Sequence, residues 1–137
     1  MADRELVQRL LRLLDNQDFE GVAALLTPAC DLQHPAATVK GAREAAAFFR
    51  GSLSGFTDCR HDLGQFVTDG DRFAVEGVWR GTNSRPIATP GGEMPATGKT
   101  VATPFAVIGT ADQQQISSLH IYSDQLGMMS QLGLTTA

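Results

Sequence analysis

Several features are scarce or missing in this sequence of 137 residues, and each absence excludes a class of protein. Only 11 lysines and arginines are present and they do not cluster, so no nucleic-acid partner is expected. No stretch approaches the roughly 20 apolar residues that cross a bilayer, and the first residues do not resemble a secretory leader. We therefore expect a cytoplasmic protein with no membrane partner.

Cysteine and histidine are also scarce. Cys30 and Cys59 lack C-x-x-C spacing, so we expect reduced residues of the core or of a pocket wall. The three histidines form no metal-binding motif, and His61 has no evident partner and is expected at the surface. Dinucleotide-binding, P-loop and nucleophile-elbow motifs are missing as well. The sequence therefore predicts no metal and no cofactor.

The composition fits one globular domain, because 42% of the residues are hydrophobic and 19% are charged. We predict a single domain over residues 1–137. Apolar residues have helical spacing over residues 6–14, and Asp3 is placed to cap that helix. A short second helix is expected between Asp18 and Pro28, and an alanine-rich third helix over residues 41–53. A short strand, 31–34, lies between these two helices.

From residue 58 onward the pattern changes to two-residue alternation, which is typical of strands. The predicted strands form two hairpins, 59–68 with 72–83 and 99–108 with 116–124, and the second turn lies near Ala111, Asp112 and Gln113. Residues 84–98 form the one long loop. Helices followed by long strands indicate an α+β fold, in which a curved antiparallel sheet wraps around helices and leaves a cone-shaped cavity.

The run from residue 116 to 124 places three reactive side chains on one face of a strand, since strand side chains alternate. These are His120, Tyr122 and Asp124. Asp124 has two interpretations at this point: a general base beside apolar residues, or an N-cap of the turn or helix that follows. Trp79, the only tryptophan, is either a stacking surface for a flat ligand or part of the core.

Several short pieces in order resemble the SnoaL-like polyketide cyclases and ester cyclases of the nuclear transport factor 2-like superfamily, relatives of ketosteroid isomerase. The resemblance covers Leu6 to Leu134. The pieces are His34-Pro35 with Gly41, Gly55 to Asp58, Asp69 to Arg72, Val75 to Thr82, Pro95 to Lys99, and Tyr122 to Gly127 with Gln131 to Leu134. The resemblance implies a cone-shaped, cystatin-like α+β roll and a homodimer. It departs from the family at Asn83, where a histidine is common, and at His120, where an aromatic is common.

In these cyclases an aspartate at the end of the last strand removes a proton next to a carbonyl and starts an aldol ring closure. Asp124 falls on that position, so the resemblance implies that Asp124 is the catalytic base and that His120 assists it. Substrate-binding residues are then expected around the cavity: Tyr122, His34, Trp79 and Phe105. Such chemistry on a hydrophobic small molecule needs no cofactor.

Three functions fit the sequence. The first is a cyclase or isomerase that takes a proton from the carbon next to a carbonyl group. The second is a binding protein with the same cavity and no catalysis. The third is an epoxide-hydrolase-like enzyme, which needs carboxylates and an arginine around a water molecule. The available arginines are Arg60, Arg72, Arg80 and Arg85.

Overall fold

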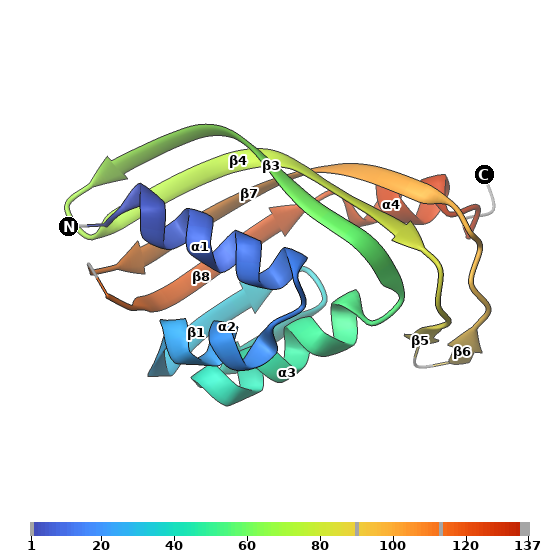
Figure 1. The fold of residues 1–137 in the computed structure, drawn as a ribbon, viewed down its shortest axis with the longest axis horizontal. Coiled ribbons are helices and arrows are strands. Elements are labelled where there is room, and N and C mark those ends of the chain that lie inside the picture. The colour runs from blue at the N-terminus through green and yellow to red at the C-terminus, as the bar shows by residue number, and fades with distance from the viewer. Residues whose placement is uncertain (1, 90, 113, 135–137) are drawn as a thin grey trace.

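The computed structural model describes residues 2–89, 91–112 and 114–134 (Figure 1). The chain begins with two helices and continues with strands, a third helix and further strands. In order the elements are α1 (Arg4–Asp15), α2 (Phe19–Leu25), β1 (Leu26–His34), β2 (Ala37–Lys40), α3 (Ala42–Leu53), β3 (Phe56–Asp69), β4 (Arg72–Asn83), β5 (Ile87–Thr89), β6 (Gly92–Met94), β7 (Thr100–Ala111), β8 (Ile116–Ser123) and α4 (Gln125–Gln131). The predicted α+β class is confirmed.

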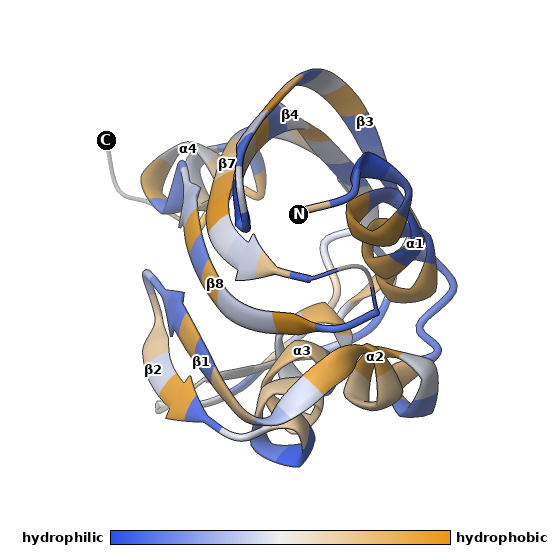
Figure 2. Ribbon diagram, turned by 90° about the vertical axis from the view of Figure 1, so that its left-hand side faces the viewer, coloured by the Kyte–Doolittle hydropathy of each residue, from blue (hydrophilic) through white to orange (hydrophobic). Residues whose placement is uncertain are grey.

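The main sheet has six strands in the order β2-β1-β8-β7-β4-β3. All neighbouring strands are antiparallel except β1 and β8, which run parallel. The sheet is therefore mixed, whereas a wholly antiparallel sheet was predicted. Figure 2 shows the sheet curving from β3 through β7 and β8 to β1, with α1, α2 and α3 on its inner side. The predicted wrapped, cone-shaped arrangement is therefore confirmed. None of the helices in the described ranges is long and apolar enough to span a membrane.

The helix starts follow from their caps. The Asp3 side chain accepts a hydrogen bond from the backbone N–H of Glu5, and Asp18 accepts one from Gly21, as their positions in the sequence predicted. Helix α1 turns a stripe of leucine and valine toward the core. Pro28 was expected to help end α2, but α2 ends at Leu25 and Pro28 lies inside β1, where the β1–β8 register shifts.

Asn83 is a fully buried polar residue that anchors the long loop to the rest of the fold. Its Nδ2 donates to the carbonyl oxygens of Gly55 at 2.9 Å and Arg85 at 3.0 Å. Its Oδ1 accepts from the backbone N–H and hydroxyl of Thr97, at 2.8 and 2.9 Å. Every polar atom of the amide is used. Asn83, which stands where the family commonly has a histidine, therefore has a structural role here.

The predicted loop, 84–98, contains the small two-stranded sheet of β5 and β6. Residue 90 of this loop lies outside the described residues. The turn predicted at Ala111, Asp112 and Gln113 falls between β7 and β8, and Gln113 likewise lies outside the described residues. The two long hairpins are confirmed, and β3 and β7 each extend beyond their predicted ranges.

Candidate functional site

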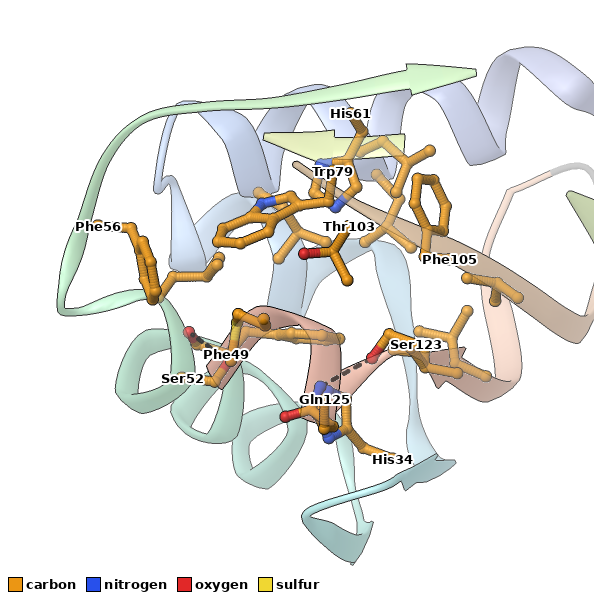
Figure 3. Close-up of a pocket in the computed structure, with 18 residues that line it drawn as sticks. His34, Phe49, Ser52, Phe56, His61, Trp79, Thr103, Phe105, Ser123 and Gln125 are labelled. Atoms are coloured by element: carbon orange, nitrogen blue, oxygen red, sulfur yellow. Dashed lines mark hydrogen bonds between the residues drawn. The ribbon is translucent and has the colours of Figure 1, made fainter. Parts of the chain in front are cut away.

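A partly enclosed cavity of about 140 Å³ lies between the inner face of the sheet and helices α1 and α3 (Figure 3). Its wall is mostly leucine, phenylalanine and other apolar side chains. A dry apolar cavity of roughly 150 Å³ in an engineered protein is large enough to bind benzene, so this cavity suits a small flat molecule. Besides the indole of Trp79, six residues bring polar side chains to the wall: His34, Ser52, His61, Thr103, Ser123 and Gln125.

Three residues of the wall lie in one row across neighbouring strands. His61 on β3 is directly opposite Trp79 on β4, and Trp79 is directly opposite Thr103 on β7. Neighbouring strands are about 4.7–4.9 Å apart, so the side chains of this row are adjacent. Figure 3 shows them gathered on one side of the cavity, with His34 and Gln125 on the other. The polar groups therefore form two separate ends of an apolar space.

His61 is held by Asp15, the last residue of α1. The Nδ1 atom of His61 lies 2.5 Å from Oδ1 of Asp15, and the His61 backbone N–H donates to Oδ2 at 3.1 Å. A carboxylate only accepts hydrogen bonds, so Nδ1 of His61 carries a proton, and in the neutral ring Nε2 then has the lone pair. Among the described residues Nε2 has no hydrogen-bond partner. The arrangement gives an oriented imidazole whose free nitrogen can accept a proton.

The prediction that His61 lies at the surface was wrong. Its side chain is 12% exposed, lines the cavity and packs against the ring of Phe105 at 5.2 Å between centroids. Asp15 and His61 are 46 residues apart in the chain, and only the packing of α1 against β3 brings them together. Sequence reasoning missed the pair because nothing local to His61 marks a partner on another element.

His34 has the opposite tautomer. Its Nδ1 accepts a hydrogen bond from the backbone N–H of Ala36 at 3.0 Å, so the proton of the neutral ring is on Nε2. Burial lowers the pKa of His34 below the ordinary histidine value, since desolvation disfavours the charged ring. The ring also packs against Phe48. At neutral pH His34 is therefore a neutral hydrogen-bond donor at its end of the cavity.

Two buried polar atoms in the wall lack any hydrogen-bond partner in the described part of the chain. They are Nε1 of Trp79 and Oγ1 of Thr103. An unsatisfied buried donor or hydroxyl costs about 1–3 kcal/mol, and native proteins keep few of them. Both belong to the row that starts at His61, so the cavity offers hydrogen bonds that the protein itself does not use.

The comparisons with known proteins show the family and the fold of the chain. The family model described as a SnoaL-like domain matches residues 7–119. The chain belongs to this family. No curated protein sequence matches the chain. Solved structures share the fold of this SnoaL-like domain, and three examples, all under 25% identical, follow.

The first is TsrD from Streptomyces laurentii, with 24% identity, a TM-score of 0.79, and coverage of 98% of this chain and 100% of that one. The second is a protein with a ketosteroid isomerase-like fold from Catenulispora acidiphila, with 16% identity, a TM-score of 0.80, and coverage of 98% and 96%. The third is a proposed SnoaL-like polyketide cyclase from Jannaschia sp. CCS1, with 21% identity, a TM-score of 0.78, and coverage of 99% and 100%.

The three site residues that the sequence predicted on β8 and directly after it lie away from the cavity. His120, Tyr122 and Asp124 do not line it, whereas Ile121 and Ser123 do. Tyr122 is 55% exposed, so the shared face of these residues is the outer one. A strand's faces alternate with each residue, and the apolar set marks the inner face. The signal was present in the sequence, because Leu119 and Ile121 are apolar.

Asp124 is exposed and caps α4, where its Oδ1 accepts the backbone N–H of Gly127 at 2.8 Å. The catalytic roles of Asp124 and His120 stay predictions, and their placement gives them no support. The predicted binding residues His34, Trp79 and Phe105 do line the cavity, although their binding role is a prediction too. The predicted homodimer also stays a prediction.

No arginine of the described ranges lines the cavity wall. Arg60 and Arg80 donate to Asp62, at 2.8 and 3.0 Å, in an exposed cluster on the outer side of the sheet. These arginines hold the pKa of Asp62 below its usual range. The wall also contains no aspartate or glutamate side chain among the described residues, so the epoxide-hydrolase-like alternative lacks its required groups. Within the same ranges no set of three or more His, Cys, Asp or Glu side chains is placed to hold a metal ion.

Proposed function

We propose that this SnoaL-like domain is a cofactor-free enzyme that removes a proton from the carbon next to a carbonyl group of a small, flat, largely apolar molecule. His61 is the general base in this proposal. The observation that carries it is the Asp15–His61 pair, whose carboxylate fixes the imidazole and leaves Nε2 free at the cavity wall. The family and its polyketide cyclase neighbours support the reaction class.

The pair suits proton transfer for two reasons. The hydrogen bond from Nδ1 to Asp15 fixes the ring orientation and the tautomer, and the bond from the His61 backbone N–H holds the carboxylate in place, so no reorganisation is needed when the proton arrives. The carboxylate also stabilises the imidazolium that forms, in a place where both side chains are largely buried, at 12% and 18% exposed. Positioned proton transfer typically contributes about 10²- to 10⁴-fold in rate.

The shape of the cavity limits the substrate. Its apolar wall and modest volume favour one or two fused rings over a long charged metabolite. His34, as a neutral donor at the opposite end, would bind a second oxygen of the substrate. The enolate formed at His61 would then either attack a second carbonyl, which closes a ring, or take back the proton at another carbon, which moves a double bond.

The test is deuterium exchange at the α-carbon of bicyclic aryl ketones such as 2-tetralone, followed by proton NMR in heavy water. The wild-type protein is expected to accelerate exchange, and His61→Gln is expected to lose about 10²-fold or more of that acceleration. Ligand binding, measured by quenching of the single tryptophan, Trp79, should change little. Binding without any accelerated exchange would indicate a binding protein and contradict the proposal.

A further inference from the structure

The unpartnered polar atoms of Trp79 and Thr103 point to a specific binding site for oxygen. We propose that the indole N–H of Trp79 and the hydroxyl of Thr103 together bind the carbonyl oxygen of the substrate and stabilise the enolate that forms there. This inference rests on the proposed function, because it assigns the oxygen-binding half of the same reaction. It gives a defined role to the two buried polar atoms that have no partner in the described chain.

The register of the sheet places these donors beside the base. Trp79 is the direct neighbour of His61 on one side and of Thr103 on the other. All three side chains line the cavity and gather on the same side of it (Figure 3). When Trp79 and Thr103 bind the carbonyl oxygen, the α-carbon of the substrate therefore lies next to His61, as removal of its proton requires.

Several other polar groups of the cavity already take part in hydrogen bonds, and the donor of His34 lies at the opposite end. The hydroxyl of Ser123 accepts from Nε2 of Gln125 at 2.8 Å, and Ser52 donates to the carbonyl oxygen of Phe49. Nδ1 of His61 is used by Asp15. On this side of the cavity, then, the unused hydrogen-bonding capacity within the described wall lies with Nε2 of His61 and the two proposed donors.

The chemistry of the donors defines the ligand group. An indole N–H can only donate, so the group that it binds must be an acceptor. No lysine or arginine lines the described wall, so nothing there offsets the charge of a carboxylate or phosphate. A neutral carbonyl oxygen that gains negative charge only during the reaction fits both conditions. The site therefore selects ketones and related carbonyl compounds over acids.

The packing holds the indole in place before any ligand binds. The ring of Phe56 meets the Trp79 ring edge-on, with 4.9 Å between centroids. Gly81 lies next on the same face, and a Cβ atom there would come within 2.9 Å of the indole. A larger residue at position 81 would displace the ring, so the glycine creates the space that the indole occupies. Donors fixed in this way stabilise developing charge without reorganisation.

The step balances without any further reactant. Nε2 of His61 takes the α-proton, and the electron pair of the broken C–H bond forms the C=C bond of the enolate. The π pair of the carbonyl moves to its oxygen, where the hydrogen bonds from Trp79 and Thr103 strengthen as the charge grows. Imidazolium and enolate are formed together, and the proton is later returned to carbon or to the new hydroxyl group.

The experiment compares two probes that differ by one oxygen, 2-naphthol and naphthalene, by equilibrium dialysis. The naphthol oxygen sits on a trigonal ring carbon, as an enolate oxygen does. Wild-type protein is expected to prefer 2-naphthol, and Thr103→Val and Trp79→Phe are each expected to reduce that preference by about three- to tenfold. Thr110→Val, the same substitution on the outer face of β7, should leave it unchanged.

The preference ratio separates the oxygen site from other effects. An equal loss for both probes would show that the side chains only fill space, and an unchanged ratio would show that the oxygen binds elsewhere; both results overturn the proposal. Failure of the wild type to bind 2-naphthol also overturns it. Because the readout is binding, a ratio that falls as expected while ketone exchange is absent would refute His61 as the base and leave the oxygen site in place.

Discussion

Thr103→Val should make the protein more stable while it weakens binding of the substrate oxygen. Thr103 is 3% exposed and its hydroxyl has no partner in the described chain, so burying this hydroxyl destabilises the folded protein. Valine has the same shape and no hydroxyl, and it suits a strand at least as well. Removing an unsatisfied buried hydroxyl should raise the free energy of unfolding by about 1–3 kcal/mol.

The expected shift in melting temperature follows from the size of the chain. The entropy of unfolding is about 2.1 cal/mol/K per residue, or roughly 0.29 kcal/mol/K for a chain of this length. A gain of about 1–3 kcal/mol then raises Tm by roughly 3–10 °C. Scanning calorimetry without ligand measures this directly, and Thr110→Val on the outer face of β7 is the matched control, expected to change stability by less than about 0.5 kcal/mol.

A lower or unchanged Tm for Thr103→Val would refute the reasoning, because the hydroxyl would then have a stabilising partner such as a bound water. A rise in Tm together with weaker 2-naphthol binding would instead show that the hydroxyl destabilises the fold and is needed for binding, a trade-off that is common at functional sites. Trp79→Phe is a less clean test of stability, since it also removes ring area that packs against Phe56.

Two further predictions concern the histidines. Asp15→Asn should slow ketone exchange by about 10²-fold or more, because the amide no longer fixes the His61 tautomer or stabilises the imidazolium; equal rates for the two proteins would contradict the role of the pair. His34 should make stability depend on pH. Because burial lowers its pKa in the folded state, the unfolded chain binds the proton more tightly, and the free energy of unfolding must fall as the pH drops below about 6.5. His34→Gln should flatten this slope between pH 7 and 5 in urea titrations, and an unchanged slope would contradict the burial argument.

The fold could be predicted because its signals are local. The leucine spacing of α1, the capping residues Asp3 and Asp18, and the two-residue alternation of the long hairpins all depend on neighbours in the sequence. The features that were not predicted depend on long-range contacts. Pro28 was expected to end a helix, yet it fits in β1 at the shift of register next to β8. That pairing joins segments nearly 90 residues apart, which local patterns cannot indicate.

The candidate site could be predicted only in part, since its key contacts are long-range. Trp79, Phe105 and His34 were assigned to the cavity from the pattern and the resemblance, and they do line it. The Asp15–His61 pair was missed because helix α1 supplies the carboxylate to a histidine on β3 that is 46 residues away in the sequence. The β8 residues were expected at the cavity because their chemistry was given more weight than the apolar residues between them, and they do not line it.

The most direct test of the central claim compares two bases in one assay. Deuterium exchange into 2-tetralone should be lost in His61→Gln and kept in Asp124→Asn, since Asp124 is exposed and caps α4, a role that asparagine also performs. Circular dichroism and binding by both variants establish that each is folded. Exchange that survives in His61→Gln and disappears in Asp124→Asn would contradict the account and assign the reaction to the carboxylate.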